Sequence, residues 1–162
     1  MTIDVVILAA GQGTRMKSTL PKVLHHLGGK PLIQHVVNTA TTVPNSDITI
    51  VTGYASEQII TSVVGDNLRY VYQKEQLGTA HAVKVAISSL TSKGTTLVVY
   101  GDVPLISSET LMATLDVVNN NTMGLLTAHN VKPEGYGRVL RDKQGQIYGI
   151  VEQKDATLEE QK

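Results

Sequence analysis

The sequence predicts an α/β fold built on a doubly wound, mostly parallel sheet. Short apolar runs rich in Val and Ile alternate with segments whose apolar residues recur at helical spacing. The first run, Val5–Ala10, is continuously apolar and stops at Gly11, as expected for a parallel strand covered on both faces. Strands that alternate with helices at this spacing imply right-handed crossovers between parallel neighbours. The 162 residues are of ordinary single-domain length.

The later elements are expected to continue this alternation. Apolar runs predict further strands at Ile48–Thr52, Arg69–Tyr72, Thr96–Tyr100 and Gly124–Ala128. Helical periodicity predicts helices at Pro31–Thr41, from Ser56 to Gly65, at Thr79–Leu90 and at Ser107–Asn119. The helix after Ser56 is expected to bury Ile59, Ile60, Val63 and Val64. Ser56 and Thr79 are side chains that can cap their helices.

The pattern changes beyond Asn130. Arg138–Arg141 and Ile147–Glu152, joined through DKQGQ, predict an antiparallel hairpin laid against the α/β core. The sequence contains no internal repeat and no low-complexity linker, and the NNN at residues 119–121 is a turn signal. A single added hairpin on an α/β domain is therefore expected.

Composition argues against several classes of partner. Lys and Arg total 14 against 14 Asp and Glu, and all six aromatic residues are Tyr, which disfavours binding of nucleic acid. Cysteine is absent, which removes disulfides and thiolate metal sites and fits a reducing compartment. The first apolar run is too short for a signal sequence or a membrane span. We therefore expect a cytoplasmic protein with no membrane partner.

A glycine-rich loop follows the first strand, at a carboxyl end where open α/β sheets bind ligands. After Gly11 and Gly13 the third position of a dinucleotide fingerprint is Met16, and Gly29-Lys30 lacks the spacing of a Walker loop. The loop can still bring backbone N–H groups to an anion. The planar guanidinium group of Arg15 and the compact ammonium group of Lys22 can supply positive charge to the same anion. A tight strand exit flanked by solvated cations is the alternative interpretation.

Asp102 directly follows the buried strand that ends at Tyr100, so its carboxylate can reach the same crevice. Mg²⁺ prefers oxygen ligands and takes one or two carboxylates together with substrate phosphates. Asp102 is therefore the candidate ligand for Mg²⁺, although Gly101-Asp102 can also form a simple turn.

A polar stretch before the helix at Thr79 supplies a candidate base-binding group. The amide of Gln73 carries a donor and an acceptor that can pair with the edge of a base such as uracil. Gly78 allows close approach to the backbone just before a helix N-terminus. An ordinary loop with a cap explains these residues equally well. None of the histidines has metal-ligand spacing, and His81 is a minor candidate because it lies near the crevice.

Several of these stretches belong to an ordered set: LAAGQGTRM with LPKVL, QLGTAHAV, YGDVPLI, GYGRV and GIVEQKDAT. From Val5 to about Thr157 the chain resembles the uridyltransferase domain of bacterial N-acetylglucosamine-1-phosphate uridyltransferases, which are bifunctional. The first motif is shared by sugar nucleotidyltransferases broadly, whereas the whole set points to this family. The resemblance implies a Rossmann-like sheet of the sugar nucleotidyltransferase type.

The implied activity is synthesis of UDP-N-acetylglucosamine and pyrophosphate from UTP and N-acetylglucosamine 1-phosphate with Mg²⁺, for peptidoglycan and lipopolysaccharide. Two alternatives stay open. One is a nucleotidyltransferase for another sugar phosphate, such as glucose 1-phosphate. The other is a fragment that binds a nucleotide without turning it over.

The resemblance also implies roles for individual residues. Those that contact the nucleotide through the opening loop are Leu8, Ala9, Ala10 and Gly11. Those that hold phosphate or metal, and so are implied to be catalytic, are Arg15, Lys22 and Asp102. Uracil recognition is implied for Gln73, Gly78 and Thr79. Residues implied to lie at the sugar nucleotide are Tyr100, Gly101 and Asp102, and those at N-acetylglucosamine are Gly137 and Glu152.

Members of the family are longer than this chain. Residues 1–162 are therefore expected to form the N-terminal part of a uridyltransferase domain. The rest of that domain, with a second metal ligand, and an acetyltransferase β-helix that makes the whole protein a homotrimer are expected to lie outside it. The oligomeric state of this chain is left open, and weak or absent activity is expected of it.

Overall fold

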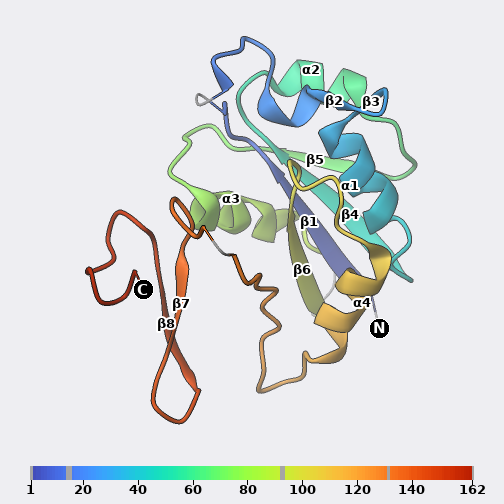
Figure 1. The fold of residues 1–162 in the computed structure, drawn as a ribbon. Helices are drawn as coiled ribbons and strands as arrows, with labels where there is room; N and C mark the ends of the chain where they lie inside the picture. The colour runs from blue at the N-terminus through green and yellow to red at the C-terminus, as the bar shows by residue number, and fades with distance from the viewer. Residues whose placement is uncertain (1, 14–15, 92–93, 131, 162) are drawn as a thin grey trace. The chain divides into compact units, whose positions relative to one another are not determined.

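The computed structural model describes residues 2–13, 16–91, 94–130 and 132–161 (Figure 1). The chain forms two compact units, Met1–Leu125 and Leu126–Lys162. The first unit contains the main sheet and its helices, and the second contains a single hairpin. None of the helices in the described parts of the chain is long and apolar enough to cross a membrane.

The main sheet of the first unit has four parallel strands in the order β5-β4-β1-β6. Their bounds are Ile3–Ala9 for β1, Ser46–Thr52 for β4, Arg69–Tyr72 for β5 and Thr95–Tyr100 for β6. The chain moves outward from β1 through β4 to β5, and then crosses back to place β6 on the other side of β1. This reversal confirms the predicted doubly wound sheet, and it puts the switch point between β1 and β6.

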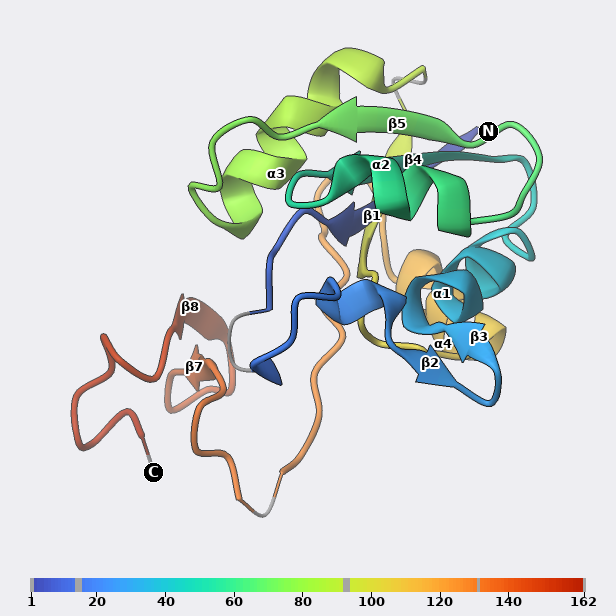
Figure 2. The same ribbon diagram turned by 90° about the horizontal axis from the view of Figure 1, so that it is seen from above.

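Four helices cover the two faces of this sheet (Figure 2). They are α1 at Leu32–Ala40, α2 at Ser56–Ser62, α3 at Thr79–Ala86 and α4 at Ser108–Asp116. Alternate residues of β1 enter two different apolar clusters: Ile7 packs with residues of α1, α2 and α4, whereas Val6 packs with residues of α3. Because both faces of β1 are buried, its residues from Val5 onward form a continuous apolar run, as predicted.

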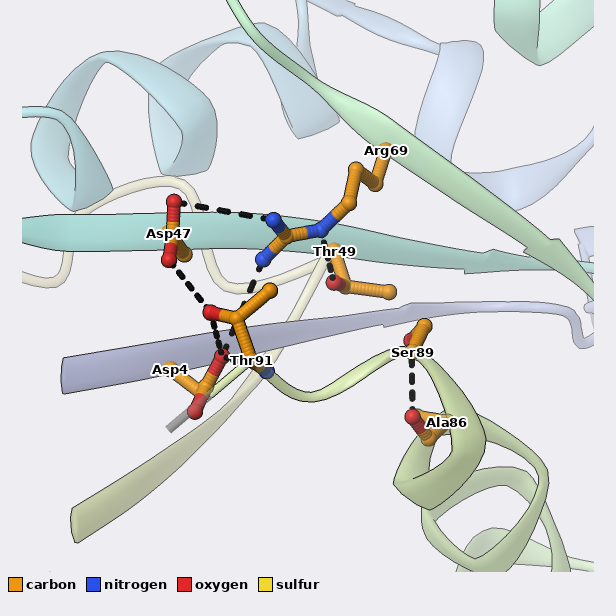
Figure 3. A network of polar contacts seen from close by, with 7 residues as sticks. All are labelled: Asp4, Asp47, Thr49, Arg69, Ala86, Ser89 and Thr91. Carbon is orange, nitrogen blue, oxygen red and sulfur yellow. Dashed lines mark hydrogen bonds and ion pairs between the residues drawn. The ribbon is translucent and has the colours of Figure 1, made fainter. Parts of the chain in front are cut away.

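A polar network ties the amino ends of the strands together (Figure 3). Asp4 of β1 is 1% exposed, and one of its carboxylate oxygens accepts the Thr91 backbone N–H at 3.1 Å. Arg69, the first residue of β5, lies 3.7 Å from Asp4 and 3.6 Å from Asp47 of β4. The hydroxyl of Thr91 donates to Asp47 as well. The network joins three strands and the segment that leads into the fourth.

The predicted strand at Gly124–Ala128 does not form, so that prediction is wrong. A strand needs hydrogen bonds from a neighbour, and the order of the described sheet ends at β6. Gly124 instead packs so closely on α4 that an added Cβ would lie 2.5 Å from the Thr114 carbonyl oxygen. An apolar run predicts that a segment can be a strand, but it does not supply the partner.

The helix α2 is shorter than predicted. It ends at Ser62, and Ile60 and Val64 are 42% and 77% exposed, so these two residues do not belong to the core. Its N-cap is Ala55, in the left-handed conformation, and Ser56 is already helical with its hydroxyl 2.7 Å from that of Thr52. The predicted cap at Ser56 is therefore wrong.

Two other local details also differ from the predictions. Gly78 occupies the N-cap of α3, with Thr79 as the first helical residue, and the last part of the expected helix is a 3₁₀ turn, η3, at Ile87–Ser89. A small hairpin that was not predicted joins β2, His26–Leu27, to β3, Lys30–Pro31. Its turn is Gly28-Gly29, both at positive φ, so the Gly-Gly pair was a hairpin signal in the sequence.

The second unit contains the predicted antiparallel hairpin, formed by β7 at Arg138–Arg141 and β8 at Ile147–Val151. None of its described residues is buried. Arg138 organises its base by donating to the Pro133 carbonyl and to Oε1 of Gln153, both at 3.0 Å. Hydrogen bonds, those of Arg138 among them, therefore hold the described part of this unit without a buried apolar core.

Candidate functional site

A pocket of about 690 Å³ opens at the carboxyl ends of β1 and β6, where the strand order reverses. This is the place where open α/β sheets bind ligands. Its lining comes from the end of β1 and the loop after it, from the 3₁₀ turn η2 at Lys22–Leu24, from the segment before α3 and from the end of β6. The pocket is therefore built by segments that are far apart in the sequence.

The loop after β1 can form its side of the pocket because Gly13 lacks a side chain. Gly13 has φ +70°, and an added Cβ would lie 2.6 Å from the Cβ of Lys22. The close approach lets η2 pack against the loop, while Val23 and Leu24 of η2 are each 4% exposed in the core. This anchoring directs the neighbouring Lys22 to the pocket wall.

Asp102 lies beside this lysine. The backbone N–H of Gly101 donates to the Leu8 carbonyl at 2.9 Å, which continues the pairing of β6 with β1 beyond the strand end. Lys22 Nζ and Asp102 Oδ2 are then 2.6 Å apart, and their side chains are 43% and 27% exposed. Both charges stay accessible, so the pair can be opened by a ligand that offers phosphates to the lysine and a cation to the carboxylate.

Gln73 forms another part of the wall and is almost fully buried, with 3% exposure. Its backbone N–H donates to the Thr52 carbonyl at 2.7 Å, which fixes it directly after β5. Its side-chain nitrogen lies 3.3 Å from the Gly78 carbonyl and 3.0 Å from Nδ1 of His81. The amide is thus held by the N-terminus of α3 rather than being free to rotate.

The structure brings most of the predicted site residues to this pocket: Leu8, Ala9, Ala10, Gly11, Lys22, Gln73, Gly78, Thr79, Tyr100 and Asp102. Gly101 is buried behind it, beside the Leu8 carbonyl, and does not line it. Arg15 lies outside the described residues. Gly137 and Glu152 belong to the second unit, where they flank the paired ends of β7 and β8, and their part in the site stays a prediction.

Five further lining residues were not among the predicted site residues: Gly13, Met16, Val23, Gln76 and Ala82. Gly13 belongs to the Gly-x-Gly pattern of the opening loop, so a signal for it was present in the sequence. The others also belong to the quoted motifs, which assigned them no role: LAAGQGTRM contains Met16, LPKVL contains Val23, and QLGTAHAV contains Gln76 and Ala82. Their place in the wall depends on how η2 and α3 pack.

The fit of a divalent cation can be judged from the donor set. Within the described parts of the chain, no group of three or more His, Cys, Asp or Glu residues could hold a metal alone. Asp102 is the carboxylate among the residues that line the pocket. One carboxylate suits Mg²⁺ that is shared with the phosphates of a bound substrate, and it does not suit a metal that the protein must hold by itself.

The sequence of the chain matches a known domain family. Residues 5–143 match the model of the MobA-like NTP transferase domain. The chain belongs to this family. It is also 51% identical over 157 residues to the bifunctional protein GlmU of Chromohalobacter salexigens, a match that covers 97% of this chain and 34% of that protein. The chain therefore spans about a third of the length of such curated relatives.

Solved structures agree with this membership at the level of the fold. A nucleotidyl transferase from Methanothermobacter thermautotroptrophicus superimposes with a TM-score of 0.66 at 22% identity, over 72% of this chain and 57% of the other. The manganese complex of Rv0371c from Mycobacterium tuberculosis H37Rv gives 0.61 at 21% identity, over 72% and 59%. Both comparisons show that the fold is shared.

Proposed function

We propose that this chain is the nucleotide-binding part of an enzyme that transfers the uridylyl group of UTP to N-acetylglucosamine 1-phosphate. The observation that carries the proposal is the meeting of Lys22 and Asp102 on one wall of the switch-point pocket. Membership of the NTP transferase family supports nucleotidyl transfer. The ordered motifs of the sequence and the similarity to GlmU support this particular pair of substrates.

The reaction is a displacement at phosphorus. An oxygen of the sugar phosphate attacks the α-phosphorus of UTP in line, the bond from that phosphorus to the oxygen that bridges to the β-phosphorus breaks, and pyrophosphate leaves with the electron pair. No covalent bond to the protein is required. The main obstacle is repulsion between two anions, so catalysis depends on positioning and on positive charge beside the phosphates.

The charges of the pocket suit this task. Lys22 can exchange Asp102 for a phosphate oxygen, because its ammonium group is partly exposed at the wall. Arg15 is proposed to hold phosphate as well. Asp102, released from Lys22, would hold Mg²⁺, which when bound neutralises charge on the triphosphate. The loop glycines let backbone N–H groups approach the nucleotide.

The remaining assignments concern recognition. We propose that uracil is contacted by Gln73, Gly78 and Thr79. The sugar nucleotide is proposed to contact Tyr100 and Gly101. Gly137 and Glu152 are proposed to bind N-acetylglucosamine. We further propose that the enzyme works in the cytoplasm, where its product supplies peptidoglycan and lipopolysaccharide synthesis, and that the longer protein is a homotrimer.

Pyrophosphate release from UTP and N-acetylglucosamine 1-phosphate tests the assignment. In the full-length protein, Asp102→Ala is expected to lower the rate by about 10²–10³-fold, by analogy with the loss of one preorganised charge partner. Asp116→Ala is the matched control, because Asp116 is an exposed carboxylate at the end of α4 and does not line the pocket. Near wild-type turnover in Asp102→Ala would end the assignment.

A second candidate is that this chain binds the nucleotide without turning it over. The observation that favours it is coverage, since the chain spans only 34% of the GlmU relative. We expect UTP to raise the melting temperature of this chain more than CTP, dTTP or GTP do, because only a ligand bound to the native state stabilises it. Rapid pyrophosphate release by this chain alone would contradict the binding-only function.

A further inference from the structure

The buried Gln73 amide is held by two groups from the start of α3. Its Nε2 atom lies 3.3 Å from the Gly78 carbonyl oxygen and 3.0 Å from Nδ1 of His81. Gly78 is the N-cap of α3, and the same carbonyl accepts the first helical hydrogen bond, from the Ala82 N–H at 3.1 Å. The amide is therefore attached to a fixed point of the helix.

The chemistry of these partners fixes the orientation of the amide. A backbone carbonyl can only accept, so the atom of Gln73 that faces Gly78 must be the NH₂ nitrogen. That nitrogen has two hydrogens, and the second points to His81. Nδ1 of His81 must then accept, which requires a neutral ring with its proton on Nε2. Both amide hydrogens are consumed within the protein.

The oxygen of the same amide is not used in these two hydrogen bonds. Within the described parts of the chain, Oε1 of Gln73 has no hydrogen-bond partner, while Gln73 lines the pocket. The pocket therefore presents an acceptor, and not a donor, at this point of its wall. An acceptor of this kind matches a base edge that offers an N–H.

We propose that His81 is a positioning residue that sets the base preference of the pocket, because its Nδ1 lone pair holds the Gln73 amide with its carbonyl oxygen toward the ligand. This inference rests on the proposed function, since the ligand it concerns is the base of the nucleotide. Uracil has an N–H at position N3, where cytosine has a bare nitrogen that would be repelled by the Gln73 oxygen. Without His81 only the 3.3 Å bond to the Gly78 carbonyl oxygen still holds the NH₂ group, so the amide rotates more readily and can offer that group to the ligand instead.

The tautomer of His81 gives a first test in the unmodified chain. The chemical shifts of the ring nitrogens, measured by NMR at neutral pH, are expected to show a proton on Nε2 and a bare Nδ1. The side-chain NH₂ protons of Gln73 are expected to be resolved and shifted by their two hydrogen bonds. A proton on Nδ1 would overturn the proposal, and this result does not depend on the folding of any variant.

Substitutions at His81 give the second test. His81→Phe keeps a ring but loses the acceptor, and it is expected to reduce the ratio of CTP to UTP dissociation constants about tenfold, the scale of one unmatched buried hydrogen bond. His81→Asn can place an amide oxygen near the position of Nδ1, so it is expected to restore most of the UTP preference. A purely structural role would weaken both nucleotides equally and leave the ratio unchanged.

The outcomes separate this inference from the proposed function. If the wild-type chain prefers CTP to UTP, the proposed uridylyl transfer fails. If the wild type prefers UTP and His81→Phe keeps the same ratio, the proposed function stands and the role of His81 is overturned. If His81→Phe does not fold, the tautomer measurement on the wild type decides.

Discussion

The two ends of the main sheet use the same kinds of charged residue in opposite ways. At the amino ends Asp4 is 1% exposed, and its partners Arg69 and Thr91 belong to the protein (Figure 3). At the carboxyl ends Lys22 and Asp102 form a closer ion pair, yet 43% and 27% of their side chains stay exposed, in a pocket. One network stabilises the fold, and the other pair is accessible to a ligand.

The two sites differ in how many further hydrogen bonds each carboxylate accepts, and in how much of its side chain stays exposed, once the ion pair is formed. The carboxylate of Asp4 receives the backbone N–H of Thr91 in addition to Arg69 and is 1% exposed, so a ligand could replace these partners only by unfolding the strand ends. Asp102 instead keeps part of its side chain exposed, beside a lysine whose side chain is also partly exposed. Burial and hydrogen bonding, not the presence of an acid and a base, distinguish a structural pair from a candidate binding pair.

The largest effect on stability is expected at the amino ends. Asp4→Ala removes the acceptor for the Thr91 N–H and one ionic partner of Arg69, and is expected to lower the free energy of unfolding by about 3 kcal/mol. Asp102→Ala is expected to cost less than about 1 kcal/mol, because its ion pair is partly exposed. Urea unfolding followed by circular dichroism measures both values. Equal decreases in the free energy of unfolding of the two variants would contradict the distinction between a structural network at the amino ends and an accessible ion pair at the carboxyl ends.

A smaller effect is expected in the loop after β1. Gly13→Ala places a Cβ 2.6 Å from that of Lys22 at a positive φ, so it is expected to lower the free energy of unfolding by about 2 kcal/mol and to displace Lys22. Gly11→Ala is the matched control, because its added Cβ would meet no atom within 4 Å and its effect should stay within about 0.5 kcal/mol. Thermal melts of the ligand-free variants compare the two. The geometry of the loop would be contradicted if Gly11→Ala were the more damaging.

The smallest effect is expected for a fully exposed carboxylate. Hydrogen bonds, first from its own backbone N–H and then from Ser107, lower the pKa of Glu109 below its ordinary value of 4.5. Because the folded pKa is lowered, this contribution to stability is present above the unfolded pKa and is lost as pH falls through the folded pKa. Glu109→Gln should therefore lower the melting temperature slightly at neutral pH and not at all in strong acid. A larger decrease of the melting temperature in acid than at neutral pH would contradict a lowered pKa of Glu109 in the folded state.

The sequence predicted the carboxyl-end site better than the amino-end network. Carboxyl ends of parallel strands meet at one edge of the sheet, so a glycine loop after β1 and an aspartate after β6 were expected at the same edge. Nothing comparable marked Asp4, Asp47, Arg69 and Thr91 as partners. Asp4 and Thr91 are 87 positions apart, and neither belongs to a motif. Their contact depends on the order of the strands, which the sequence pattern does not encode locally.

The wrong predictions have the same origin. Gly124–Ala128 has the composition of a strand but lacks a neighbour to pair with, and Ile60 has the spacing of a core residue but lies on the exposed side of a short helix. The periodicity of apolar residues indicates which side chains of a segment could face a core. Which neighbour is available to cover it is a property of the whole chain.

By itself, the sequence determined the alternation of strands and helices, the glycine loop with its lysine, and the aspartate after β6, because these depend on local periodicity and on the parallel direction of the strands. Only the tertiary structure decided which polar groups are satisfied within the protein and which face the pocket. The hydrogen-bond partners of Gln73 lie 5 and 8 positions further along the chain, at the start of α3, and Thr91, a partner of Asp4, lies 87 positions away. A side chain's free donors and acceptors are known only when all of its neighbours are in place.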